Sequence, residues 1–248
     1  MKPMITAHSG CEGTARDSME SVELALALGA DAIEMDIRRA PDGLLYISHD
    51  RRTDSEIAEK HTLEAVFQRI ADTPMKFNCD IKEPFAIPGV LQMARCYGME
   101  ADRLILTGVV LPSLLGEEPW ITQASSVWLN VDLALKYLYM ERLMEREYDL
   151  SKQQEGELLQ QEQCVEAVVA LAKTLGVRGI NLRHAHATHA LVDRLHENGL
   201  LCSVWTLKDA QAIDRVLRLQ VDNVTTTTVS LALERSKHFY NNNLGGNL

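Results

Sequence analysis

The sequence predicts an α/β protein that folds as a single (β/α)8 barrel. Short runs of β-branched and other apolar residues alternate with longer helical patterns from one end of the chain to the other, which is typical of repeated βα units. Eight such runs occur, and eight is the number of strands that close this barrel. The length of 248 residues is also the usual size of one barrel domain.

The predicted strands and helices follow one another in order along the chain. Strands are expected at residues 4–7, 32–37, 76–81, 103–107, 126–131, 179–182, 201–205 and 223–226. Between them, apolar residues recur at helical spacing, and several of these patterns end at a glycine, as helices commonly do. Helices are expected at residues 18–28, 63–71, 88–97, 165–175, 189–197 and 210–217.

A β-hairpin extension is expected after the second strand. The turn Pro41-Asp42-Gly43 leads into an alternating segment, residues 44–48, which ends at the pair His49-Asp50. No linker rich in Pro or Ser divides the chain, so residues 1–240 are predicted to form one barrel domain.

Two polar segments depart from the βα pattern. Residues 141–163 are rich in Glu and Gln and carry no strand pattern, so they are interpreted as a solvated helical excursion after the fifth strand. Residues 241–248 are rich in Asn and Gly and are expected to form a flexible C-terminal tail.

Composition and charge exclude several classes of function. The formal net charge is −10 and the Lys and Arg residues are scattered, so no surface for nucleic acid is expected. The first residues lack the apolar core of a signal peptide, and no apolar run approaches the roughly 20 residues that span a bilayer, so a cytoplasmic location is expected. The five cysteines lie far apart without a CxxC pair, which predicts free thiols.

Three carboxylates are expected to meet at one end of the barrel, where polar residues at the carboxyl ends of the strands form the active site. Side chains alternate along a strand, so Glu34 and Asp36 share one side of the second strand. Asp80 and Lys82 share one side of the third. Taken alone, Glu34 and Asp36 also fit two solvated carboxylates on an edge strand. Three close carboxylates favour a hard cation such as Mg2+ or Ca2+, because without one they repel each other and take up protons.

Two histidines are placed to reach the same end of the barrel. His8 ends the first strand, and His49 ends the hairpin that follows the second strand. A pair of imidazoles near a metal ion is suited to general acid and base catalysis near neutral pH. The pair therefore favours a catalytic site over a solvated strand edge.

These motifs resemble, in order, those of the glycerophosphodiester phosphodiesterase family, which has a phosphatidylinositol-phosphodiesterase-like TIM barrel. The resemblance extends over most of the chain. It involves the family's His-Arg-Gly, Gly-Ala-Asp with Glu-x-Asp, Asp-Gly, His-Asp, carboxylate-x-Lys, Trp-Thr-Val and Val-Asp-Gly-Ile-x-Thr motifs. The counterparts are His8-Ser9-Gly10, residues 29–36, Asp42-Gly43, His49-Asp50, Asp80 with Lys82, residues 204–207 and residues 221–226.

The resemblance implies a metal-dependent hydrolase that cleaves glycerophosphodiesters into glycerol phosphate and an alcohol. It implies that the three carboxylates bind the divalent metal ion and that His8 and His49 are catalytic. In the family, the metal ion and a lysine, here Lys82, polarise the phosphate. One histidine helps an attacking hydroxyl to lose its proton, and the other protonates the leaving alkoxide. When the attacking hydroxyl belongs to the glycerol of the substrate, a cyclic phosphate forms and water then opens it.

The chain departs from the family pattern near the first histidine. Ser9 stands where the family has Arg, and Ala15-Arg16-Asp17-Ser18 stands where the family has Pro-Glu-Asn-Thr. Because an anionic substrate needs local cations on a protein of net charge −10, Arg16 is predicted to replace the missing guanidinium in part. Asp80 replaces the commoner Glu. The segment after His49-Asp50 is short, which implies a reduced capping insertion.

Further side chains are candidates for the substrate site. Arg183 and Arg38 follow strand ends and are candidate phosphate contacts. Trp205 is expected either to form an apolar wall for the substrate or to lie in the barrel core. Asn78 shares a side of its strand with Asp80 and is expected to orient a ligand. The segment that contains His184, His186 and His189 fits a solvated loop better than a second metal site.

Two other functions stay open at this point. The same residues would serve a lyase-type, phospholipase D-like activity that stops at a cyclic phosphate. The changes at Ser9 and Arg16 are compatible with a non-catalytic phosphoester-binding barrel. Retention of both histidines and all three carboxylates favours the hydrolase, whose partner is a small-molecule glycerophosphodiester. The sequence leaves a homo-oligomer open.

Overall fold

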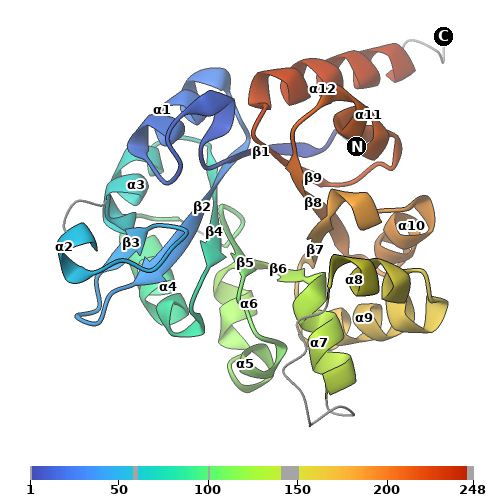
Figure 1. Cartoon of the computed structure of the whole chain (residues 1–248), viewed down its shortest axis with the longest axis horizontal. Helices are drawn as coiled ribbons and strands as arrows, with labels where there is room; N and C mark the ends of the chain where they lie inside the picture. Colours follow the sequence, from blue (N-terminus) through green and yellow to red (C-terminus); the bar gives the residue numbers. More distant parts are fainter. Residues whose placement is uncertain (1, 58–60, 100, 141–150, 245–248) are drawn as a thin grey trace.

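Eight parallel strands close into a barrel in the computed structural model of the chain, which describes residues 2–57, 61–99, 101–140 and 151–244. Within these residues the sheet runs β1-β9-β8-β7-β6-β5-β4-β2-β3, and a further pairing of β1 with β2 closes the barrel. β3 lies outside the barrel and pairs antiparallel with β2. Helices surround the strands (Figure 1). The predicted (β/α)8 barrel with a hairpin extension is confirmed.

The observed strands agree closely with the predicted ones. Their bounds are β1 Met4–His8, β2 Ala32–Arg39, β3 Leu45–Ile47, β4 Lys76–Ile81, β5 Leu104–Gly108, β6 Ser126–Asn130, β7 Gly179–Arg183, β8 Leu201–Leu207 and β9 Asn223–Thr226. The α-helices are α1 Met19–Leu28, α2 Asp54–Ile57, α3 Leu63–Ile70, α4 Ile87–Cys96, α5 Pro112–Glu117, α6 Trp120–Ala124, α7 Val131–Met140, α8 Lys152–Leu159, α9 Glu162–Thr174, α10 His189–Glu197, α11 Ala210–Arg218 and α12 Val229–Leu244. Three short 3-10 helices are η1 Cys11–Gly13, η2 Pro84–Ala86 and η3 His184–His186. Between β3 and α3 the described residues hold only α2, as a reduced capping insertion requires.

Short polar side chains start the helices that follow the strands. Ser18 accepts a hydrogen bond from the backbone N–H of Ser21 at the start of α1, and Thr62, Thr188 and Asp209 cap α3, α10 and α11 in the same way. Such caps satisfy backbone donors that lack partners within the helix. At the other end of α1, Gly29 has a φ of +73°, a conformation that is costly for residues with a Cβ.

The alternation of β2 divides its side chains between two environments. Ile33, Met35 and Ile37 are fully buried and belong to the large apolar core. Glu34 and Asp36 point the other way and line a cavity at one end of the barrel. One strand therefore contributes both to the stability of the core and to the chemistry at the barrel end.

Polar side chains fill much of the barrel interior and are hydrogen bonded to one another. Thr6 donates to Asn223 (2.7 Å), Thr107 donates to Asn78 (2.8 Å), and the Asn181 amide donates to Asn130 (2.8 Å). Each pair joins neighbouring strands of the barrel. Because a buried polar group is costly unless it has a partner, these pairs hold the strands in register.

Both polar segments contain helix where the structure describes them. Helix α12 continues to Leu244, so the predicted tail is helical over residues 241–244, and residues 245–248 lie outside the described range. In the segment 141–163, residues 141–150 are not described, and α8 is helical as predicted. However, Glu155 of α8 is buried and pairs with Arg183 (3.5 Å), so this helix is not simply solvated.

The described residues bear out the prediction for the cysteines, which are all free; only Cys96 is exposed. None of the described helices is both long enough and apolar enough to cross a bilayer.

Candidate active site

A cavity of about 320 Å³ lies at the carboxyl end of the barrel strands, and we call it the mouth cavity. This is the end at which barrel enzymes carry their active sites. Eight of the nine predicted site residues line it, and they come from β1, β2, β4, β8 and the loops that follow β1, β3 and β4. These eight are His8, Arg16, Glu34, Asp36, His49, Asp80, Lys82 and Trp205.

 Arg183, the ninth predicted site residue, does not line the cavity.

The three carboxylates lie close enough together to share one cation. Oxygen atoms of Glu34, Asp36 and Asp80 all lie within 4.8 Å of one another. The register of the barrel explains this, since Asp36 pairs directly with Asp80 across β2 and β4. Lys82 bridges two of them, with its Nζ 2.5 Å from Asp36 Oδ1 and 3.1 Å from Asp80 Oδ1. Strand alternation and register thus produce the predicted acidic cluster.

The electrostatics of this cluster favour a positive charge beyond Lys82. Desolvation, and then the neighbouring Asp36 and Asp80, raise the pKa of Glu34 well above its usual value. Desolvation is also the main cause that raises the pKa of Asp80 to about 6, against the opposing effect of Lys82. Glu34 is 5% exposed, and its Oε2 has no hydrogen-bond partner within the described part of the chain. A hard cation would satisfy this oxygen and lower the repulsion, so the cluster fits a divalent metal ion.

His8 presents one ring nitrogen to the mouth cavity. Its Nδ1 lies 2.7 Å from the carbonyl oxygen of Ser9. Because a carbonyl only accepts, Nδ1 carries the proton, and Nε2 of the neutral ring has a free lone pair. Burial is the main cause that lowers the pKa of His8, which favours this neutral form. Nε2 lies 3.7 Å from Glu34 Oε2, so a proton acceptor stands beside the acidic cluster.

His49 has a fixed backbone and a more exposed ring. Its backbone N–H donates to Asp17 Oδ2 (2.8 Å), and its carbonyl accepts from Arg38 Nε (3.0 Å). The ring is about half exposed, and its Nδ1 lies 2.9 Å from Asp50 Oδ1. Arg38 also pairs with Glu83. Arg38, a candidate phosphate contact from the sequence, therefore holds the His49 loop in place and does not line the mouth cavity.

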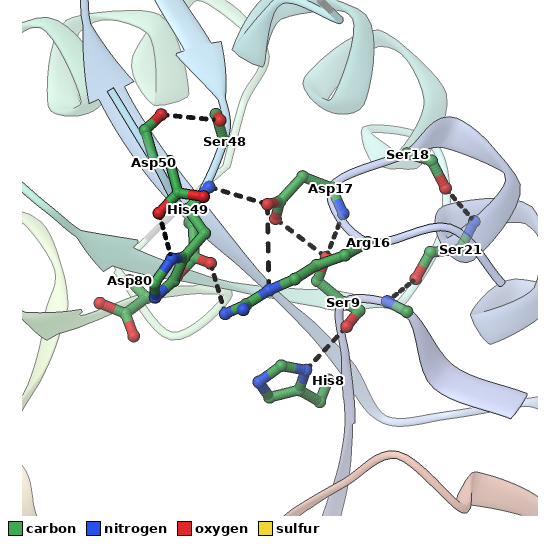
Figure 2. A network of polar contacts seen from close by, with 12 residues as sticks. His8, Ser9, Arg16, Asp17, Ser18, Ser21, Ser48, His49, Asp50 and Asp80 are labelled. Atoms are coloured by element: carbon green, nitrogen blue, oxygen red, sulfur yellow. Dashed lines mark hydrogen bonds and ion pairs between the residues drawn. The ribbon is translucent and has the colours of Figure 1, made fainter. Parts of the chain in front are cut away.

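Asp17 links the two histidine-bearing segments, and it was not among the site residues predicted from the sequence. Its carboxylate accepts from the Ser9 hydroxyl (2.9 Å) as well as from the His49 backbone, and its own N–H donates to Ser9 Oγ (2.5 Å). Figure 2 shows Asp17 between Ser9, Arg16 and His49. Asp17 is nearly buried and has a φ of +53°, which is uncommon for a residue other than glycine. Ser9 therefore anchors this junction in the place where the family has Arg.

Arg16 reaches the acidic cluster from the loop that follows β1. Its Nη2 lies 2.9 Å from Asp36 Oδ2, on the opposite oxygen from the one that Lys82 contacts. Its side chain is 46% exposed, so the guanidinium remains accessible from the cavity. The structure thus brings Arg16 next to the site, as predicted from the missing Arg after His8.

The other side of the mouth cavity is formed by amides, an aromatic ring and one carboxylate. Asn130 and Asn181 form their hydrogen-bonded pair there, beside Trp205 and Asp132. The two asparagines stand at or near the ends of apolar strands. A polar residue at a strand end is the pattern that identified His8 and the carboxylates, and the same pattern would have identified Asn130 and Asn181.

Arg183 and the histidine-rich segment lie behind this side of the cavity. The guanidinium of Arg183 lies 4.6 Å from the centre of the Trp205 ring and pairs with Glu155, so it does not reach the cavity itself. His186 lies 3.7 Å from Glu155 and packs against Gly156, where a Cβ would come within 2.9 Å of the ring. Among the described residues, the acidic cluster is the only group with the spacing of a metal site, so the alternative of a second one at the histidines finds no support.

The model of the glycerophosphoryl diester phosphodiesterase family matches residues 8–76 and 133–230. The chain belongs to this family. The resemblance seen in the motifs is therefore confirmed, and so is the predicted class of enzyme at the level of the family.

Individual relatives are distant but cover nearly the whole chain. A glycerophosphodiester phosphodiesterase of Caldanaerobacter subterraneus is 22% identical over 241 residues, which cover 91% of this chain and 94% of the relative. The crystal structure of a glycerophosphodiester phosphodiesterase from Thermotoga maritima aligns with a TM-score of 0.69 at 20% identity, over 94% of this chain and 98% of the other. A phosphodiesterase of Oleispira antarctica, solved with the product sn-glycerol-3-phosphate, aligns with a TM-score of 0.68 at 14% identity, over 95% and 97%.

Proposed function

We propose that this chain hydrolyses glycerophosphodiesters, releasing glycerol phosphate and an alcohol. The observation that carries the proposal is the meeting, in one cavity, of an acidic cluster with the spacing of a metal site, two cationic side chains and two histidines. A binding protein has no need of two imidazoles placed beside such a cluster. The relative solved with sn-glycerol-3-phosphate as its product supports a small-molecule substrate for this chain too.

A divalent cation, Mg2+ or Ca2+, is the cofactor that the acidic cluster fits. Glu34, Asp36 and Asp80 would hold it, and the unpartnered Oε2 of Glu34 supports this assignment. When bound, such an ion offsets the negative charge that develops on the phosphoryl oxygens. The same ion would offset the desolvation, and then the repulsion from Asp36 and Asp80, that raise the pKa of Glu34.

Arg16 and Lys82 would bind and orient the phosphodiester. Both contact the Asp36 carboxylate, on different oxygens, so two positive charges stand beside the cluster. A protein of net charge −10 repels anions at long range, and these two local cations counter that repulsion where the substrate binds. Arg16 would thereby serve in place of the guanidinium lost at Ser9.

His8 is suited to remove a proton and His49 to return one. The free Nε2 of His8 faces the cavity from a half-buried ring, so it would accept the proton of the attacking hydroxyl. The Asp50 carboxylate beside Nδ1 of His49 holds the ring in place at the cavity, so His49 would donate a proton to the leaving alkoxide. An alkoxide departs poorly without that proton.

Substrate assays with product analysis test the proposal. The purified protein is incubated with a panel of glycerophosphodiesters, with and without a chelator, and products are followed by 31P NMR. Glycerol phosphate that forms only with free divalent ions supports the hydrolase. A cyclic phosphate that persists would identify the lyase-type activity, and no turnover of any diester would leave a binding barrel. The cytoplasmic location and a homo-oligomeric state stay predictions from the sequence.

A further inference from the structure

A second cavity lies at the opposite end of the barrel, and we call it the base cavity. Its volume is about 670 Å³. Its lining includes Met4, Lys76, Ser126 and Leu201, which are the first residues of β1, β4, β6 and β8. Because the strands are parallel, their first residues gather at the end away from the mouth cavity. The base cavity therefore shares no residue with the proposed active site.

Three cationic side chains that have no partner among the described residues line the base cavity. Lys2, Lys76 and Arg178 all line it. Within the described ranges, none of the three forms an ion pair or a side-chain hydrogen bond. Surface arginines elsewhere do form ion pairs, as Arg69 does with Glu23. In a chain of net charge −10, three unpaired cations at one cavity mark a local positive field.

The acidic residues at this cavity do not cancel that field. Asp222 also lines it, but its Oδ2 accepts from the backbone N–H of Cys202 (2.8 Å) and lies 2.8 Å from His196 Nε2. Asp102 is exposed and lies within 4.0 Å of none of the three cations. Three cations thus face two carboxylates, one of which already has partners.

The indole N–H of Trp128, a residue that lines the same cavity, has no hydrogen-bond acceptor within the described residues. Trp128 of β6 lines the base cavity and is only 5% exposed. Its indole Nε1 is buried and has no hydrogen-bond partner in the part of the chain that the structure describes. An indole N–H is a donor only, and a buried donor without an acceptor is unfavourable. An anion in this cavity would supply acceptor oxygens to the indole and opposite charge to the cations.

We propose that the base cavity is a binding site for a phosphate-type oxyanion, held by Lys76, Arg178 and the indole N–H of Trp128. Lysine and arginine both bind phosphate, arginine through its planar fork of donors and lysine as a point charge. Lys2 adds positive charge at the rim. The site is separate from the mouth cavity, so anion binding here does not depend on the proposed catalysis.

The three tryptophans of the chain allow a direct test. The protein is labelled with 15N-tryptophan, the indole signals are assigned with Trp128→Phe and Trp205→Phe, and inorganic phosphate is added in the presence of a chelator. Ionic strength is held constant with sodium chloride. The indole signal of Trp128 is expected to shift and saturate. The signal of Trp205 in the mouth cavity reports any binding at the other end of the barrel.

Matched variants decide the outcome. Lys76→Met and Arg178→Met are each expected to weaken phosphate binding roughly tenfold, which corresponds to about 1.4 kcal/mol for a charge-assisted contact. Lys237→Met, which removes a lysine from α12, is expected to leave the affinity unchanged, and diester hydrolysis should persist in all three variants. A Trp128 signal that does not move would overturn the proposal. So would a shift that chloride reproduces, or one that keeps its wild-type affinity in both Lys76→Met and Arg178→Met.

Discussion

The two sides of the mouth cavity differ in chemistry although they belong to the same barrel. The side built by β1, β2, β4 and the loops after them, which we call the ionic wall, carries three carboxylates, two cations and two histidines. The side built by β6, β7, β8 and the start of α7, the amide wall, carries Asn130, Asn181, Trp205 and one carboxylate, Asp132. In the proposed function, the ionic wall binds the metal ion and moves protons. The amide wall offers hydrogen bonds and an apolar surface, so it is suited to contact the alcohol part of a diester.

The largest expected effect comes from the histidines of the ionic wall. His8→Ala and His49→Ala should each lower kcat by about two to four powers of ten, the usual range for loss of a general acid or base. Both residues lie at the cavity and outside the apolar core, so circular dichroism and the melting temperature should stay close to wild type. His189→Ala, which removes an exposed histidine at the start of α10, is the matched control. Near-wild-type activity in either catalytic variant would remove the two-histidine mechanism.

Substitutions of Arg16 test how the ionic wall binds an anionic substrate. Arg16→Ala should raise KM by roughly ten- to a hundredfold, because a charge-assisted hydrogen bond contributes about 1.5–3 kcal/mol. Arg16→Lys keeps the charge but loses the planar fork, so its KM should lie between those of Arg16→Ala and wild type. Steady-state kinetics on the best diester measure both. An unchanged KM in Arg16→Ala would mean that Arg16 does not replace the missing Arg.

Substitutions of Asp17 test whether the ionic wall depends on the hydrogen bonds that Asp17 forms with Ser9 and the His49 backbone. Asp17→Ala removes acceptors for Ser9 and the His49 backbone, so His49 should lose its fixed position and kcat should fall about tenfold with little change in KM. Asp17→Asn keeps one acceptor oxygen and should recover part of kcat. The pH dependence of kcat provides the second measurement. A purely structural role would instead lower the melting temperature and leave kcat of the folded fraction unchanged.

The amide wall should give the smallest effect, and it should depend on the substrate. Trp205→Leu is expected to change kcat/KM by roughly two- to tenfold, which corresponds to about 0.5–1.5 kcal/mol for an aromatic contact. The size of the change should vary with the alcohol of the diester, because that part would contact the ring. A loss comparable to that of His8→Ala for every diester would place the chemistry on the amide wall.

The sequence predicted the ionic wall better than the amide wall. Alternation along β2 and adjacency of β4 are local rules, so Glu34, Asp36 and Asp80 could be placed together without coordinates. Arg16 also followed from the charge missing at Ser9. The partner of Arg183 could not be found this way, because Glu155 lies in a polar helix whose packing depends on the folded barrel. The role of Asp17 likewise depends on a left-handed backbone and on a loop distant in sequence.

Metal binding should depend on pH in a direction set by the acidic cluster. The raised pKa values of Glu34 and Asp80, about 6 for the latter, mean that protons occupy the cluster in acid and compete with a cation. A divalent ion should therefore raise the melting temperature more at pH 7.5 than at pH 5. An effect of equal size at both pH values would show that the ion binds elsewhere.

The central claim is that Glu34, Asp36 and Asp80 hold one divalent cation, and thermal unfolding of the chelated protein tests it most directly. An ion that binds only the folded state stabilises it by mass action, so Mg2+ or Ca2+ should raise the melting temperature of the wild type. Asp36→Asn and Glu34→Gln should each abolish this increase. Asp132→Asn, which removes a carboxylate from the amide wall of the same cavity, should retain it. An increase that survives in both Asp36→Asn and Glu34→Gln, or no increase in the wild type with either ion, would contradict the account.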